Sequence, residues 1–188
     1  MHLRRLSIIV FNYDRCLEQF LVRALMNYFR MGYKEAAELV RLCVIKHPYG
    51  SLGPFLAEDG GEIAFGGGSQ IDMRPGLNLL SMARRLRTYT EQITDEVALA
   101  SQKSLLERAN TVVFLGFEFH QQNMDSLEVS RDSNVERVFS TAFRVPDPEI
   151  PIIRRKVIRS MRTSVEHTMA SAECSDFLRN YAGLLAQE

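Results

Sequence analysis

The sequence predicts an α/β fold, a Rossmann-like three-layer sandwich with a mainly parallel sheet, and three observations lead to this prediction. Nearly continuous apolar runs of strand length occur at Leu6–Phe11 and Thr111–Gly116, which is typical of strands covered on both faces. Segments with apolar residues at helical spacing, such as Arg15–Arg30, alternate with the strands. No internal repeat and no linker divides the chain. We therefore expect a single domain over residues 1–188.

The first elements follow from spacing and capping residues. Asp14 can cap the helix predicted over Arg15–Arg30, since a short acidic side chain accepts hydrogen bonds from the first free N–H groups. A second helix is predicted over Lys34–Arg41, and the apolar segment Leu42–Ile45 predicts a short buried strand. The glycine-rich stretch Gly50–Gly76 predicts a long loop or flap with one hairpin.

The second half of the chain continues the alternation around the strand at 111–116. Helices are predicted over residues 77–85, 95–110, 122–129, 150–161 and 172–186, with a further strand over 137–143. The helix over 150–161 carries a basic stripe, which consists of Arg154, Arg155, Lys156, Arg159 and Arg162. We interpret the stripe as a solvated helix face, with contact to nucleic acid or a protein partner as the alternative.

The composition favours neither nucleic acid nor a membrane as a partner. Lys plus Arg and Asp plus Glu both number 23, so the formal net charge is zero. No apolar stretch approaches the roughly 20 residues that a membrane-spanning helix needs. The three cysteines, Cys16, Cys43 and Cys174, form no CxxC pair, so the sequence predicts neither a zinc site nor a disulfide framework. We expect a cytoplasmic protein without a bound metal.

Two polar residues follow the first two predicted strands. Asn12 comes directly after the apolar run of the first strand, and His47 lies in a loop after the second. An amide can hold a water molecule by donating and accepting hydrogen bonds together, while a histidine titrates near neutral pH and can accept that water's proton. Both residue types therefore suit a hydrolytic site, and the resemblance described next implies that Asn12 and His47 are its candidate catalytic residues.

Three segments, in this order, resemble the sirtuin-like family of NAD-binding proteins. Ile9–Glu18 resembles the family's strand that ends in Asn-Tyr-Asp, with a glutamate in the following helix. Val44–Leu52 is similar to its His-Gly-Ser loop, and Val113–Phe119, with Asn123–Asp125 after it, is similar to the later strand-glycine segment. Together the matches cover roughly Ser7–Leu127. Their order and spacing make the resemblance more specific than any one motif.

The resemblance implies a function in NAD chemistry. The divergent bacterial members that share the Asn-Tyr-Asp form tend to hydrolyse NAD rather than deacetylate proteins, and the zinc module of the deacetylases has no counterpart here. Hydrolysis would break the N-glycosidic bond to nicotinamide, with Asn12 and His47 at the ribose. The resemblance also implies nucleotide-binding roles for a further set of residues: Asp14, Gly50, Ser51, Gly116 and Phe117. NAD is then the expected substrate or ligand.

The glycine-rich nucleotide loop that opens sirtuin-like domains has no counterpart ahead of Asn12. In the family, backbone N–H groups of that loop hold the pyrophosphate at a helix N-terminus. We therefore expect the chain to be truncated at its N-terminus relative to the family, either as a fragment or as a short form. The alternative function is a non-catalytic module that senses a nucleotide or binds a protein, including a homo-oligomer formed through an exposed sheet position.

Overall fold

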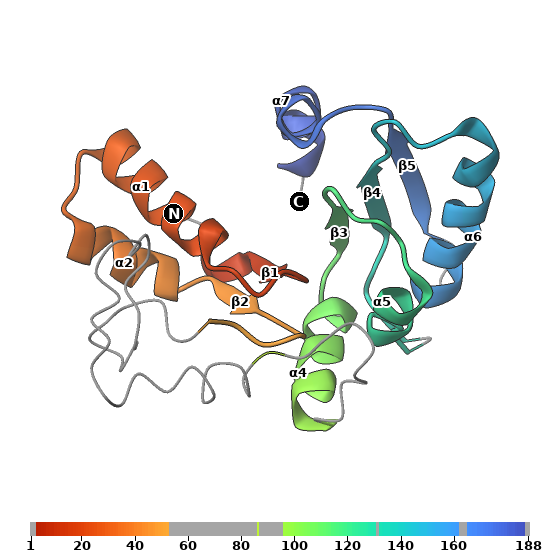
Figure 1. Ribbon diagram of the computed structural model, residues 1–188, viewed down its shortest axis with the longest axis horizontal. Coiled ribbons are helices and arrows are strands. Elements are labelled where there is room, and N and C mark those ends of the chain that lie inside the picture. Colours follow the sequence, from red (N-terminus) through yellow and green to blue (C-terminus); the bar gives the residue numbers. More distant parts are fainter. Residues whose placement is uncertain (1–2, 53–85, 87–95, 131, 162–164, 187–188) are drawn as a thin grey trace. The chain divides into compact units, whose positions relative to one another are not determined.

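The computed structural model describes residues 3–52, 86, 96–130, 132–161 and 165–186, and Figure 1 traces its elements. The chain divides into two compact units, residues 1–95 and 96–188, which are described separately below. Both units combine helices with parallel strands, so the α/β prediction is confirmed at that level. The predicted glycine-rich flap beyond residue 52 and the predicted helix over 77–85 lie outside the described part of the chain.

The first unit is a strand, a helical hairpin and a second strand. Its elements are the 3₁₀ turn η1 (Leu3–Arg5), β1 (Ser7–Ile9), α1 (Cys16–Phe29), α2 (Tyr33–Arg41) and β2 (Val44–Lys46). The strands β1 and β2 pair in parallel, with Ile8 opposite Ile45. This pairing brings the carboxyl ends of both strands to the same edge, where the segments with Asn12 and His47 begin.

Small apolar residues hold α1 and α2 together. Val22 on α1 and Ala36, Ala37 and Val40 on α2 are buried and form one cluster. The alanines let the two helices of this hairpin approach closely (Figure 1). The first helix ends at Arg30, which adopts a left-handed conformation with φ of 53°. With Arg30 as the C-cap residue, the last helical residue of α1 is Phe29, and the helix ends before it reaches Gly32.

The second unit contains a three-stranded parallel sheet. Its elements are α4 (Glu96–Glu107), β3 (Thr111–Phe114), α5 (Gln121–Ser126), β4 (Arg137–Thr141), η3 (Asp147–Glu149), α6 (Ile150–Met161), β5 (Glu166–Ala170) and α7 (Cys174–Leu185). The strand order is β3-β4-β5 (Figure 1). The observed bounds of the helices and of β3 and β4 differ from the predicted bounds by no more than three residues at any end. The strand β5 was not predicted.

Aromatic rings cover one face of this sheet. Phe177 of α7 is fully buried, stacks on Tyr181 with ring centroids 4.6 Å apart and lies beside Phe139 of β4. Successive side chains on a strand point to opposite faces, so Val138 and Ser140 face away from α7. Both are completely buried as well. The side chains of β4 are therefore buried on both faces of the sheet.

None of the helices in the described segments is long and apolar enough to cross a membrane.

Candidate functional site

His47 is held between two segments of the first unit. The strand β2 ends at Lys46, whose carbonyl accepts a hydrogen bond from Val10 N at 2.8 Å and so extends the pairing with the β1 segment. The His47 ring then lies with Nδ1 2.8 Å from the backbone oxygen of Asn12 and Nε2 2.9 Å from Oε1 of Glu18. Both ring nitrogens are thus engaged by oxygen acceptors. Parallel strand pairing brings Asn12, Glu18 and His47 together although 35 residues separate Asn12 from His47.

The chemistry of these contacts fixes the position of one proton on His47. A carbonyl oxygen can only accept, so Nδ1 carries a hydrogen and donates it to Asn12. The Nε2 atom then faces a carboxylate oxygen of Glu18, and a neutral ring would present a lone pair to that oxygen. A proton between Nε2 and Glu18 removes this repulsion. The geometry therefore favours proton uptake by the His47–Glu18 pair.

The pKa of His47 responds to opposing influences. Burial lowers it, but the hydrogen bonds to Glu18 and to the Asn12 carbonyl, together with the negative charge of Glu18, outweigh burial. The net result is a pKa above the ordinary value of 6.5. Protonated His47 and ionised Glu18 then form a hydrogen-bonded ion pair with side chains that are 10% and 11% exposed. Such a pair is shielded from solvent, which strengthens its electrostatic interaction.

Glu18 has one oxygen that is not engaged. Its Oε1 atom contacts His47, whereas Oε2 is buried and receives no hydrogen bond from the described part of the chain. A buried carboxylate oxygen without a donor is costly, so this atom is a strong acceptor for a hydroxyl group or a water molecule. Glu18 lies one helical turn after Asp14 in the same motif. In the sequence Glu18 is only the glutamate of the helix that follows the Asn-Tyr-Asp motif, and it was not predicted to be a site residue.

The Asn12 side chain is exposed, so its contact with His47 involves the backbone alone. Asp14 accepts a hydrogen bond from Cys16 N at 2.9 Å, but it lies one residue before the N-cap, which is Arg15 and makes no side-chain cap hydrogen bond, so the predicted capping role of Asp14 is wrong by one position. The hydrogen bond from Cys16 N lowers the pKa of Asp14 below its ordinary value of 3.8. The exposed amide of Asn12 is therefore available to a ligand at this edge.

The loop after His47 is tightly turned. Gly50 has φ of 82°, a region that favours glycine, and its N–H donates to the His47 carbonyl at 3.0 Å. Within the same turn Tyr49 is buried and packs edge-on against Phe11 at 6.0 Å. Ser51 is half-buried beyond the turn. Gly50 and Ser51 thus lie next to the His47 site, and the turn fixes the direction of the His47 side chain.

Gly116 and Phe117, the other predicted nucleotide-binding residues, belong to the second unit. Gly116 has φ of 57° and its N–H donates to Thr141 Oγ1 at 2.9 Å. Phe117 packs against Phe114 and Phe119, with ring centroids 5.3 and 5.2 Å away. The positive φ favours glycine, so the local backbone conformation is sufficient to explain a glycine at position 116. Its role in binding a nucleotide stays a prediction.

Comparisons with known proteins give no match: no family model, no curated protein and no solved structure matches this chain. The resemblance to sirtuin-like proteins therefore stays a prediction that depends on the residues described above.

A second histidine contact occurs within the sheet of the second unit. Ser140 Oγ lies 2.9 Å from His167 Nε2, and His167 Nδ1 is buried without a partner in the described segments. Burial, aided by the positive charge of Arg154, lowers the pKa of His167 to about 4. Because Ser140 is fully buried, no substrate reaches its hydroxyl. The Ser140–His167 pair is therefore a structural contact. The site residues were predicted from polar residues that follow strands, whereas Ser140 and His167 lie within strands.

Protonation of His47 is expected to contribute to stability in acidic and not in alkaline solution. The folded-state pKa lies above the unfolded value of 6.5, so the contribution is complete below 6.5 and is lost as the pH rises through the folded-state pKa. The variant His47→Asn keeps a donor near the Asn12 carbonyl but does not titrate. The difference in free energy of unfolding between wild type and variant, measured by urea denaturation, should be larger at about pH 5.5 than at about pH 8.5. A difference that grows with pH would contradict the assignment.

Proposed function

We propose that this chain is a sirtuin-like NAD-binding domain with a Rossmann-like three-layer sheet, and that it hydrolyses NAD to nicotinamide and ADP-ribose. One observation carries the proposal: Asn12, Glu18 and His47, from two motifs that are separate in the sequence, form one hydrogen-bonded cluster at the carboxyl ends of β1 and β2. Ligands of open parallel sheets bind at that edge. The cluster combines an exposed amide, a histidine and a buried carboxylate.

The reaction needs a water molecule, a site for its proton and stabilisation of positive charge. Water adds to C1′ of the nicotinamide ribose, the N-glycosidic bond breaks, and nicotinamide leaves with the bonding electron pair. The exposed amide of Asn12 is suited to orient that water or a ribose hydroxyl. The proton lost by the water goes to the His47–Glu18 pair when that pair is in its unprotonated form. The negative charge of Glu18 also stabilises an oxocarbenium-like transition state.

A second candidate function is nucleotide sensing without cleavage. Both ring nitrogens of His47 are hydrogen-bonded within the protein, to Asn12 and to Glu18. In this arrangement the ring positions the Asn12 backbone and the Glu18 carboxylate, and a proton from water reaches it only through Glu18. A site of this kind can hold a ribose hydroxyl through the exposed Asn12 amide while leaving the glycosidic bond intact.

Incubation of the purified chain with NAD is expected to release nicotinamide, which chromatography detects directly. The pH dependence supplies a second readout, because the rate should rise with pH through the raised pKa of His47 as its ring loses a proton and becomes a base. NAD binding should be measured in parallel by titration calorimetry. Binding without release would support the sensing function, and the absence of both would contradict the proposal.

A further inference from the structure

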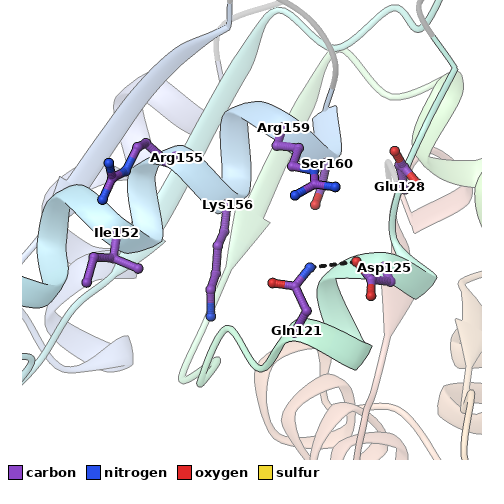
Figure 2. A pocket seen from close by; sticks show the side chains of 8 residues that line it. All are labelled: Gln121, Asp125, Glu128, Ile152, Arg155, Lys156, Arg159 and Ser160. Carbon is purple, nitrogen blue, oxygen red and sulfur yellow. Dashed lines mark hydrogen bonds between the residues drawn. The ribbon is translucent and has the colours of Figure 1, made fainter.

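A cavity of about 210 Å³ lies between α5 and α6, entirely within the second unit. Figure 2 shows its two walls: Lys156 and Arg159 come from α6, while Gln121 and Asp125 come from α5. Arg155 lies one turn before Arg159 on the same helix. The cavity is separate from the cluster around His47, which belongs to the first unit. Neither the proposed reaction nor the sheet core uses these side chains.

The α6 wall presents three cations. Val157 is fully buried against the core, so the basic side chains project from other sides of the helix. Arg155 and Arg159 are four residues apart and lie on one side of α6, and neither guanidinium pairs with any residue that the structure describes. Lys156 Nζ donates to the Phe119 carbonyl at 2.9 Å, which anchors its ammonium at the cavity. The lining therefore has three cationic side chains, spread along α6, and two carboxylates, Asp125 and Glu128.

The α5 wall presents oxygen acceptors. Gln121 Nε2 donates to Asp125 Oδ1 at 2.7 Å, and this bond fixes both side chains (Figure 2). The Gln121 carbonyl oxygen and the second Asp125 oxygen remain as acceptors. Glu128 adds a carboxylate and Ser160 a hydroxyl to the lining. An anion alone would be repelled by these carboxylates, whereas an anion that also carries hydroxyl groups could satisfy both walls.

Size and charge narrow the class of ligand. Pockets for drug-sized ligands have volumes of roughly 300 to 1,000 Å³, so this cavity suits a smaller molecule than a dinucleotide. Guanidinium groups bind phosphate through paired, charge-assisted hydrogen bonds, and a phosphate monoester can use Arg155, Lys156 and Arg159 together. Hydroxyl groups on the same ligand would donate to Gln121 and Asp125.

We infer that the cavity between α5 and α6 is a binding site for a small phosphorylated polyol or sugar. Arg159 and Arg155 bind the phosphate, and Gln121 and Asp125 accept hydrogen bonds from the hydroxyl groups. The site does not depend on the proposed NAD chemistry. The basic stripe of α6 is therefore only in part a solvated face, because two of its arginines and its lysine line a cavity.

Titration of the full chain with ribose 5-phosphate tests this inference, with binding followed by calorimetry and by the NMR signals of the Gln121 side-chain amide. The variant Arg159→Gln should weaken binding about tenfold or more, since it removes a charge-assisted contact. The matched control Arg154→Gln removes the same charge from the same helix but from outside the cavity, and it should bind as wild type does. Equal binding by both variants would overturn the inference.

Three further ligands, inorganic phosphate, ribose and NAD, test the contributions of the α6 wall and the α5 wall and the size limit of the cavity. Inorganic phosphate and ribose should each bind more weakly than ribose 5-phosphate, because each satisfies only one wall. If phosphate alone bound as tightly as the ester, the role of Gln121 and Asp125 would be refuted. NAD added in excess should not displace the ester, because the dinucleotide exceeds the cavity. A failure of nicotinamide release would leave these outcomes unchanged, so the two proposals fail separately.

Discussion

Replacement of His47 by alanine is expected to lower the rate of nicotinamide release by about 100- to 10,000-fold, the range usual for the loss of a positioned acid or base. The reason lies in the cluster that His47 completes. Its ring bonds the Asn12 carbonyl and Glu18 Oε1 at the same time, so alanine removes the orientation of both segments. It also removes the nitrogen that shares a proton with Glu18. The initial rate of nicotinamide formation at saturating NAD measures the effect.

Matched variants distinguish chemistry from folding. His120→Ala changes an exposed histidine of the second unit whose ring lies 2.7 Å from Glu118 Oε2, and the rate should stay close to that of wild type. His47→Asn retains a donor toward Asn12 but cannot take up a proton, so it should fold as wild type by circular dichroism and still lose activity. A His47→Asn variant with a wild-type rate would refute the catalytic role.

The variant Glu18→Gln tests whether His47 takes part in proton transfer or only positions the neighbouring segments. If the His47–Glu18 pair acts as the base, Glu18→Gln removes the negative charge while it preserves the shape of the side chain and lowers kcat more than it raises KM. If His47 only positions the neighbouring segments, Glu18→Gln can still hold the ring by a neutral hydrogen bond and the rate changes little. The comparison therefore separates proton transfer from positioning in the same site.

Most of the fold could be predicted because its signals are local. Periodic apolar positions locate α1 to within one residue at each end, and the apolar run at Thr111–Phe114 locates β3. The strand β5 has no such signal. Its sequence, Glu166–Ala170, contains two polar ionisable residues and no apolar run, and its pairing with β4 supplies the order that its own residues do not specify.

The candidate site was predictable in its residues but not in its contacts. Asn12 and His47 follow strands that end at the same edge, which parallel pairing of β1 and β2 explains. The Glu18 contact depends on the entry angle of α1 as well as on that pairing, since 29 residues separate Glu18 from His47. Local spacing carries no information on such an angle. The unpaired Glu18 Oε2 could therefore be found only in three dimensions.

Truncation of Phe177 to alanine is expected to cost about 3 to 5 kcal/mol in free energy of unfolding, the range for removing a fully buried aromatic ring. Phe177 is 0% exposed and lies between Phe139 of the sheet and Tyr181 of its own helix, stacked on the latter at 17°. Its removal leaves a cavity at the contact that holds α7 on the sheet. Urea denaturation measures the change.

The adjacent residue supplies the control for this variant. Leu178 is 46% exposed on the same helix, so Leu178→Ala changes helix propensity little and removes far fewer contacts. We expect a loss below about 1 kcal/mol for that variant. Equal losses for the two variants would mean that α7 is held by its helical propensity rather than by the Phe177 ring. A large loss confined to Phe177→Ala would establish that this one ring fixes α7 on a sheet whose opposite face carries the buried Ser140.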